Sequence, residues 1–174
     1  AVFGGATVSW MNEETSEVGS VRLTPPEGIN PVAFIPDFEL RTAAARAALP
    51  ATVPHGDASF NVARGALLAA ILSGGAQASG GVNLHALLME ATRDRLHQEK
   101  RRAAMEPSLA LVDWLRGAGF AAVVSGAGPT VLSLEKVGAD IRRDAAGAGW
   151  RVVPLAVAAS GVQITRGSLA KVEF

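Results

Sequence analysis

A glycine-rich turn between two short apolar runs constrains this chain more than any other feature. Residues 120–124 (FAAVV) and 131–134 (VLSL) have the apolar, partly β-branched composition of buried strands, and SGAGPT at 125–130 joins them. Glycine tolerates positive φ, whereas Pro129 fixes φ and removes a backbone donor, so the connection is predicted to be a tight loop. The chain is therefore expected to contain a buried sheet with this turn at its end.

The composition of this loop is compatible with two roles. Ser125, Gly126, Ala127, Gly128 and Thr130 supply hydroxyl groups, small side chains and backbone N–H groups, which together suit an anion such as a phosphate or a carboxylate. Glycines also occur wherever a strand must turn sharply against a helix. The loop alone leaves both roles open, and the choice depends on the rest of the chain.

Composition excludes several function classes. The 174 residues include 16 basic and 16 acidic ones, so no overall field attracts nucleic acid or an anionic membrane. No cysteine is present, which rules out disulfides, thiol catalysis and cysteine-bound zinc. No apolar stretch reaches the roughly 18 to 20 residues of a membrane span. The first residues, AVFGG, lack an initiator methionine and the basic start of a signal peptide, and we expect the chain to be part of a longer protein.

Short strands dominate the first forty residues. Apolar and β-branched residues at 6–10, an alternating pattern at 18–24 and a buried run at 32–35 predict three strands, and their short connections favour an antiparallel meander. Two more strands flank the glycine-rich loop. The chain then closes with strand patterns at 150–156 and 162–165.

Between the early and the late strands, apolar residues recur at the spacing of α-helices. Thr42 is expected to cap a short helix over 43–49, and Asp57 or Ser59 is expected to cap a longer one. Further helices are expected at 84–96, 108–116 and 138–146, with a flexible surface loop at 73–81. Strands, then helices, then strand, strand, helix and strand predict an α+β fold with a mostly antiparallel sheet covered on one face.

A few polar residues stand out as candidate functional groups. Thr42 and Arg46 are four residues apart, so a helix places a hydroxyl beside a guanidinium, and arginine binds a carboxylate or phosphate with two parallel hydrogen bonds. A capping threonine beside a solvated arginine explains the same pair. His97, in the charged run 93–102, is a candidate general base, but the sequence shows no positioned partner for it. Asn61, early in a helix, is typical of a local capping residue.

Four segments, by their order and spacing, resemble the C-terminal portion of the homoserine kinases, a family of GHMP small-molecule kinases. VVSGAGPT at 123–130 is similar to the third GHMP signature. FIPDFELRTAAARAALP at 34–50 is similar to the stretch entering the substrate-facing helix, and HGDASFNVAR at 55–64 to the segment that follows. DRLHQEKR at 94–101 is similar to a second arginine motif. The resemblance covers nearly all of the chain, residues 1–174, and implies a ferredoxin-like C-terminal domain.

The resemblance also implies a substrate site. It assigns Arg46 and Arg101 to the carboxylate of L-homoserine, places Thr42 near the transferred phosphate or the substrate hydroxyl, and includes Asn61 among the substrate-binding residues. The glycine-rich loop at 125–130 is expected to back this site. The implied reaction is ATP-dependent phosphorylation of the side-chain hydroxyl of homoserine, on the way to threonine, by a cytoplasmic enzyme.

The sequence departs from the family pattern in two respects. Members often have Pro-Tyr-Arg where this chain has Glu99, Lys100 and Arg101, which leaves Arg102 as an alternative to Arg101. The phosphate loop of the family's N-terminal domain is absent, and phosphoryl transfer needs such cation and dipole stabilisation. We therefore expect a substrate-side fragment that is inactive and binds no cofactor alone. ATP, Mg²⁺ and the catalytic groups are then expected in a missing N-terminal domain, against which residues 40–58 pack.

Two alternative functions remain open. One is another GHMP kinase, acting on a mevalonate-type or sugar substrate; a sugar is disfavoured because it offers no carboxylate to the two arginines. A non-catalytic, amino-acid-binding regulatory module is favoured by the missing nucleotide loop. The expected partners of the kinase are L-homoserine and ATP, without nucleic acid or membrane, and a homodimer is compatible with the sequence. No metal site is expected in this chain, since no spacing of His, Asp and Glu matches a ligand set.

Overall fold

The chain divides into two structural units. The computed structural model describes residues 6–74, 81–158 and 161. One unit comprises Ala1–Leu23 and Ala158–Phe174, and the other comprises Thr24–Val157. The predicted strand at 162–165 and most of the predicted loop at 73–81 lie outside the described residues.

An antiparallel hairpin makes up most of the described part of the first unit. Its strands, β1 (Thr7–Met11) and β2 (Val18–Arg22), pair with Trp10 opposite Gly19. A Cβ atom at Gly19 would lie 2.3 Å from the Trp10 ring, so the absence of a side chain lets the indole lie across the neighbouring strand. In the turn, Oδ1 of Asn12 accepts hydrogen bonds from two backbone N–H groups, which explains the polar residues between the strands.

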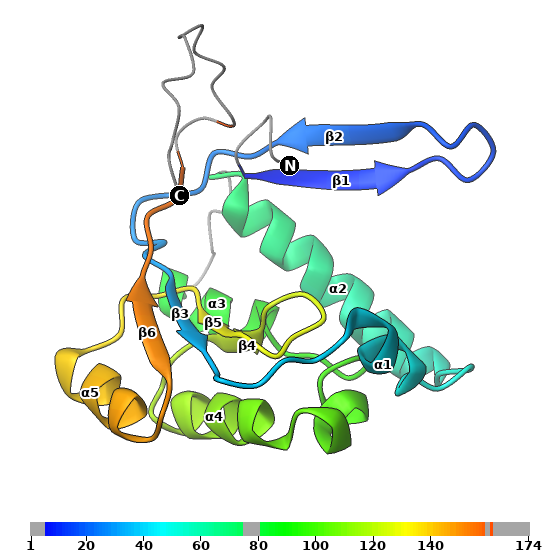
Figure 1. Ribbon diagram of the computed structural model, residues 1–174. Coiled ribbons are helices and arrows are strands. Elements are labelled where there is room, and N and C mark those ends of the chain that lie inside the picture. Colours follow the sequence, from blue (N-terminus) through cyan, green and yellow to red (C-terminus); the bar gives the residue numbers. More distant parts are fainter. Residues whose placement is uncertain (1–5, 75–80, 159–160, 162–174) are drawn as a thin grey trace, which may run out of the picture. The chain divides into compact units, whose positions relative to one another are not determined.

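The second unit is built on a four-stranded antiparallel sheet (Figure 1). Its strands, in the order β4-β5-β3-β6, are β4 (Ala122–Val124), β5 (Val131–Ser133), β3 (Val32–Ile35) and β6 (Arg151–Pro154). Along the chain the order is strand, helices, strand, strand, helix, strand. This order, with β3 inside the sheet, is the ferredoxin-like arrangement. The predicted α+β fold with an antiparallel, ferredoxin-like sheet is confirmed.

The predicted meander is wrong at its third strand. β3 lies between β5 and β6, with Phe34 opposite Val131 on one side and Val152 on the other. Val32, Ala33 and Phe34 are buried, whereas the residues of β1 and β2 are mostly exposed. Because buried backbone groups must be paired, a strand buried this completely needs a hydrogen-bonded neighbour on both edges.

Several helices accompany the sheet in the second unit. They are α1 (Thr42–Ala47), α2 (His55–Leu72), α3 (Leu84–Ala91), the 3₁₀-helix η2 (Glu99–Ala104), α4 (Glu106–Gly117) and α5 (Ala139–Gly147). The helix caps predicted at Thr42, Asp57 and Ser59 are wrong. Thr42 is the first residue of α1, and the other two lie inside α2, which begins directly after Pro54. Pro54 holds an extended backbone, with a ψ of 138°, and so ends the preceding loop without a side-chain cap.

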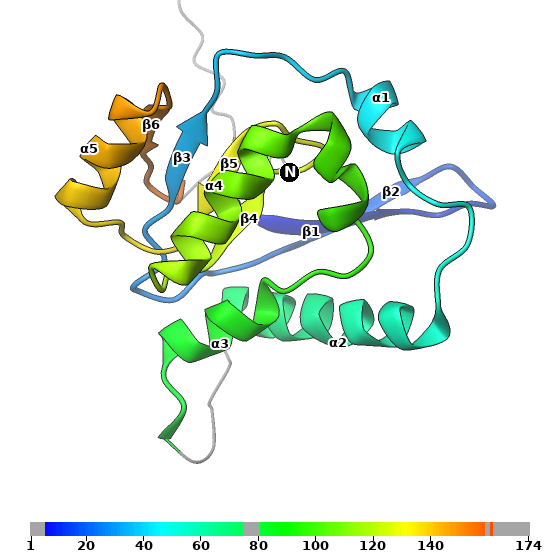
Figure 2. The same cartoon turned by 90° about the horizontal axis from the view of Figure 1, so that it is seen from below.

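Helices α4 and α5 pack on one face of the sheet, and Figure 2 shows α4 lying across β4 and β5. The core between them contains Phe34, Val131 and Leu115, all fully buried. A separate apolar cluster joins α2 to α3 through Ile71 and Leu88. The long helix α2 is thereby fixed at its C-terminal end, and its residues from Asn61 to Leu72 contribute to a wall of the pocket described below.

Residues 40–58 have a partner inside this chain for part of their length. Ala45 of α1 is fully buried in a cluster with Met105 and Leu109. Residues 51–56 are exposed. Their packing against another domain stays a prediction.

Candidate functional site

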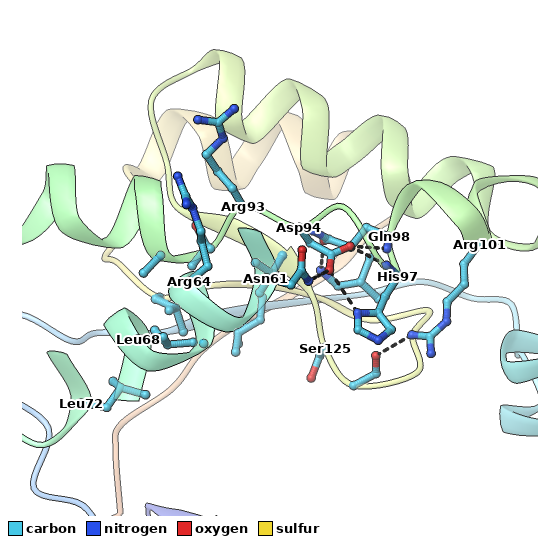
Figure 3. A pocket seen from close by; sticks show the side chains of 18 of the residues that line it. Asn61, Arg64, Leu68, Leu72, Arg93, Asp94, His97, Gln98, Arg101 and Ser125 are labelled. Atoms are coloured by element: carbon cyan, nitrogen blue, oxygen red, sulfur yellow. Dashed lines mark hydrogen bonds and ion pairs between the residues drawn. The ribbon is translucent and has the colours of Figure 1, made fainter. Parts of the chain in front are cut away.

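A pocket of about 620 Å³ opens between α2, the segment after α3, and strands β4 and β5 (Figure 3). Part of its wall is apolar. Val123 and Leu132 are cross-strand partners, and their side chains face away from α4 because their neighbours Ala122 and Val131 are buried in the core on that side. Leu68 of α2 also lines the pocket. The open face of the sheet thus forms the base of the site.

Asp94 organises the polar rim of the pocket. Its Oδ2 accepts hydrogen bonds from the backbone N–H groups of His97 (2.8 Å) and Gln98 (2.7 Å), and its Oδ1 accepts one from Nδ2 of Asn61 (2.6 Å). The predicted helix over 84–96 is wrong beyond the end of α3, because this carboxylate caps the next turn instead. Asn61 thereby joins α2 to that turn.

The same contacts settle the ionisation of Asp94. Burial raises the pKa of this carboxyl, but the hydrogen bonds from Gln98, Asn61 and His97 outweigh burial and hold the pKa below its ordinary value. A carboxylate can only accept, so Nδ1 of His97, at 3.1 Å from Oδ1, carries the proton in this contact. The positioned partner of His97 that the sequence did not show is therefore Asp94.

Two backbone carbonyls hold Arg101 at the edge of the pocket. Its Nε donates to the carbonyl oxygen of Ala45 (3.1 Å), and its Nη1 donates to that of Gly126 (3.3 Å). These bonds use two of the five guanidinium N–H groups, and the other three have no acceptor among the described residues. The turn that carries Arg101 is tied to β4 by Gln98, whose Oε1 accepts from the backbone N–H of Val124 (2.8 Å).

Two further arginines, Arg64 and Arg93, line another part of the pocket, and Arg95 lies close to the first of them. The guanidiniums of Arg64 and Arg95 lie over the ring of Phe60, at 3.7 and 3.9 Å from its centroid. Arg64 and Arg93 both pair with Glu90. The pKa of that glutamate is lowered, most strongly by the hydrogen bond from Arg64 and next by the one from Arg93. These guanidiniums are therefore largely engaged with groups of the protein itself.

The structure brings together part of the predicted site. The predicted residues that line the pocket are Asn61, Arg101, Ser125 and Gly126. Thr42 and Arg46 lie on the exposed side of α1 and do not line it. Among the described residues, Arg46 has no side-chain hydrogen bond or ion pair.

The glycine-rich loop is held mainly by contacts of its own. The N–H of Ser125 donates to the carbonyl of Thr130 (2.8 Å), and the N–H of Gly128 donates to that of Ser125 (3.0 Å). These two N–H groups are therefore engaged, which reduces the set that the sequence offered to an anion. Ala127 packs against the cluster that contains Met105, and Gly128 lies directly beside the Met105 side chain. These two middle residues of the loop therefore contribute to packing as well.

Arg101 and Arg102, the two candidates left by the sequence, have different surroundings. Arg102 donates to Glu99 (2.9 Å) and to Asp113 (2.9 Å) and does not line the pocket. Its hydrogen bonds, those with Glu99 first, raise the pKa of Arg102 further above its ordinary value. Arg102 is thus engaged in ion pairs, and Arg101 is the candidate that faces the pocket.

Several pocket residues were not singled out from the sequence, namely Asp94, Gln98 and Arg64. A local signal existed for the first of them. An aspartate followed by unpaired backbone N–H groups two to four residues later often accepts from them, and Asp94 does so. Arg64 gave no such signal, because its position depends on how α2 meets α3.

Two further classes of feature are absent from the described part of the chain. No group of three His, Asp or Glu side chains there is placed to hold a metal ion. None of the helices in that part is long and apolar enough to span a membrane. The polar groups that do gather at the pocket are two amides, two hydroxyls, an imidazole, a carboxylate and guanidiniums, which recognise ligands by hydrogen bonds and charge.

Comparison with known proteins gives a consistent result. Residues 67–148 match the family described as GHMP kinases C terminal. The homoserine kinase of Streptomyces avermitilis is 43% identical over 164 residues, which cover 94% of this chain and 50% of that protein. The homoserine kinase of Corynebacterium efficiens is also 43% identical, over 165 residues that cover 91% of this chain and 50% of that protein. The chain thus spans about half the length of these curated relatives.

A solved structure shares the fold. The crystal structure of a homoserine kinase from Cytophaga hutchinsonii superposes with a TM-score of 0.67 over 80% of this chain and 45% of that one. The two sequences are 19% identical over this match. At that identity, the likeness supports the architecture of the domain and nothing finer.

Proposed function

We propose that this chain, which carries a GHMP kinase C-terminal domain over residues 67–148 and is homologous to the homoserine kinases, is the substrate-side part of a homoserine kinase. The complete enzyme transfers the γ-phosphoryl group of ATP to the side-chain hydroxyl of L-homoserine, a cytoplasmic step toward threonine. Within it, the pocket between α2 and the sheet binds homoserine.

The placement of Arg101 carries this proposal. Its guanidinium is oriented by the carbonyls of Ala45 and Gly126 at the edge of the pocket, and its other three N–H groups have no acceptor in the described part of the chain. A planar guanidinium that is already held in place recognises a carboxylate with two parallel hydrogen bonds. An amino acid offers that carboxylate, and the apolar wall formed by Val123 and Leu132 suits its aliphatic chain.

Arg46 and Thr42 extend the proposed site from α1. Arg101 donates to the carbonyl of Ala45, the residue before Arg46, so both arginines belong to one packed region. Arg46 is exposed, and its guanidinium has no acceptor among the described residues. We propose that it joins Arg101 at the substrate carboxylate, with Thr42 one helical turn away toward the hydroxyl end.

The described residues do not fit ATP with Mg²⁺. Two loop N–H groups, those of Ser125 and Gly128, donate within the chain, and no group of three His, Asp or Glu side chains in the described part is placed to hold a cation. We therefore derive no step through the nucleotide. The use of ATP and Mg²⁺ is proposed because the relatives are named as kinases. This chain covers half of their length.

Two measurements test the proposal. Isothermal titration of the chain with L-homoserine is expected to show binding, and with D-galactose, which has no carboxylate, none. Coupled detection of ADP is expected to show homoserine-dependent turnover by the full-length gene product and none by these 174 residues alone. Absence of homoserine binding together with absence of turnover would overturn the kinase assignment. Binding without turnover by the full-length product would instead support an amino-acid-binding module.

A further inference from the structure

The polar rim contains a hydrogen-bond acceptor that the carboxylate-binding arginines do not explain. His97 lines the pocket four residues before Arg101, and its carbonyl accepts from the backbone N–H of Arg101 (3.1 Å). In Figure 3 the imidazole ring lies between Asp94 and the guanidinium of Arg101. About half of the His97 side chain is exposed, so a ligand can reach it.

The tautomer of His97 follows from its contact with Asp94. Both oxygens of Asp94 accept hydrogen bonds from Asn61 and from backbone N–H groups, so the carboxyl is ionised and Nδ1 of His97 must donate to it. In the neutral ring, Nε2 then carries a lone pair and points away from Asp94. Among the described residues Nε2 has no hydrogen-bond partner, since only the contact through Nδ1 is formed.

Three neighbouring side chains at this part of the rim, those of Asn61, Gln98 and Asp94, already accept hydrogen bonds from the protein. Oδ1 of Asn61 accepts from the backbone N–H of Arg95 (2.9 Å), and Oε1 of Gln98 accepts from that of Val124 (2.8 Å). The oxygens of Asp94 are occupied as described. Nε2 of His97 is therefore an available acceptor beside the guanidinium of Arg101.

We propose that His97 is the residue that recognises the α-ammonium group of the substrate, through a hydrogen bond from that ammonium to Nε2. This inference rests on the proposed function and deepens it. The carboxylate and ammonium of an α-amino acid are attached to one carbon atom, so a ligand whose carboxylate binds Arg101 presents its ammonium to a group one helical turn away. Asp94 is the positioning residue, because it fixes the ring and its tautomer. The pair Arg101 and His97 thus selects α-amino acids over simple hydroxy acids.

Three ligands and two variants test this proposal by titration of the chain at about pH 8, where imidazole is ordinarily neutral. L-Homoserine has carboxylate, ammonium and hydroxyl; 4-hydroxybutanoate lacks the ammonium, and L-2-aminobutanoate lacks the hydroxyl. His97→Asn keeps a donor for Asp94 but has no atom at the position of Nε2. His97→Gln places an amide oxygen near that position and serves as the conservative variant.

The unmodified chain is expected to prefer homoserine to 4-hydroxybutanoate by about 10- to 100-fold, the usual effect of a hydrogen bond to a charged group. His97→Asn is expected to abolish most of this preference while leaving the affinity for 4-hydroxybutanoate unchanged, and His97→Gln to retain part of it. If His97→Asn prefers homoserine to 4-hydroxybutanoate as strongly as the unmodified chain does, the role of His97 is overturned while homoserine binding stays intact. The same holds if this variant loses only its preference for homoserine over L-2-aminobutanoate, because that preference reports on the hydroxyl and not on the ammonium. Failure of the unmodified chain to bind homoserine would overturn the proposed function and this inference with it.

Discussion

The side-chain amide of Asn61 donates to Oδ1 of Asp94 over 2.6 Å and thereby joins α2 to the turn between α3 and η2. The same amide accepts from the backbone N–H of Arg95, so one side chain closes two hydrogen bonds between segments 33 and 34 residues apart. The pocket therefore keeps its shape through a contact between its two walls.

Replacement of Asn61 by alanine is expected to lower the free energy of unfolding by about 1–3 kcal/mol, because Asp94 and the N–H of Arg95 each lose a partner. Urea denaturation followed by circular dichroism measures this. Val62→Ala, in the same helix at a residue that is 72% exposed, is the control and is expected to change stability by less than about 0.5 kcal/mol. Equal effects of the two substitutions would contradict the role of Asn61.

Asp94 is expected to make stability depend on pH on the acid side. Burial raises its pKa, but stronger hydrogen bonding holds the folded pKa below the ordinary 3.8, so the carboxylate form is favoured by folding. Its contribution is fully present above that ordinary value and is lost as the pH falls through the lower folded value. Asp94→Asn is therefore expected to destabilise the protein at pH 7, and the difference from the unmodified chain is expected to shrink below about pH 4. A difference that is constant between pH 7 and about pH 3 would contradict this assignment.

Arg101 and Arg102 form a matched pair for ligand binding. Arg101→Lys is expected to weaken homoserine binding by about 10- to 100-fold, because an ammonium cannot make two parallel hydrogen bonds to a carboxylate. Arg102→Lys is expected to leave the affinity within about twofold, because Arg102 contacts Glu99 and Asp113 outside the pocket, and a twofold change is well under the energy of one hydrogen bond. Titration calorimetry with L-homoserine measures both. The reverse order of effects would transfer the carboxylate-binding role to Arg102.

Much of the fold could be predicted from local pattern, but the pairing of the strands could not. The strand at 32–35 was expected from its apolar run, yet nothing in that run shows that its neighbours are β5 and β6, which follow it by about a hundred residues. Strand pairing depends on long-range packing, here on burial of Phe34 against α4. The caps predicted at Asp57 and Ser59 are wrong because Pro54 fixes the start of α2 at His55, earlier than side-chain propensity indicated.

The candidate site was predicted in part. Arg101, Asn61, Ser125 and Gly126 line the pocket and were singled out because they lie in contiguous motifs, whereas Ala127, Gly128 and Thr130 of the same loop do not line it. The role of Asp94 was missed because it depends on three-dimensional contacts with α2 and with the backbone of its own turn. His97 was undervalued for the same reason, since its partner becomes visible only when that turn is folded.

Gly126 and Gly128 are expected to differ in their tolerance of a side chain. Both have positive φ, 59° and 89°, but a Cβ at Gly128 would lie 2.7 Å from Sδ of the buried Met105, whereas one at Gly126 would meet nothing within 4 Å. Gly126→Ala is expected to cost about 1 kcal/mol for the left-handed backbone alone. Gly128→Ala is expected to cost about 2–4 kcal/mol, because crowding in a packed core adds to that strain. Denaturant unfolding of both variants measures the difference, and equal costs would show that Met105 moves aside freely.

Arg116 is expected to stabilise the domain through hydrogen bonds to neutral groups. It is half-buried, and its guanidinium donates to Oγ1 of Thr92 (2.9 Å) and to the carbonyls of Met89 (2.8 Å) and Ala122 (3.3 Å), which joins α4 to the end of α3 and to β4. The pKa of this guanidinium is lowered, mainly by burial and to a smaller extent by repulsion from the positive charge of Arg93.

Arg116→Ala is expected to lower the free energy of unfolding by about 2–4 kcal/mol, since three acceptors lose their donor at once. Arg116→Lys is expected to recover only part of this, because a single ammonium cannot reach acceptors on three segments. Arg143→Ala, at an exposed arginine of α5, is the control and is expected to stay within about 0.5 kcal/mol of the unmodified protein. If Arg116→Ala unfolds at the same denaturant concentration as this control, the three hydrogen bonds contribute nothing net to stability, and the contact between α3 and β4 must depend on apolar packing instead.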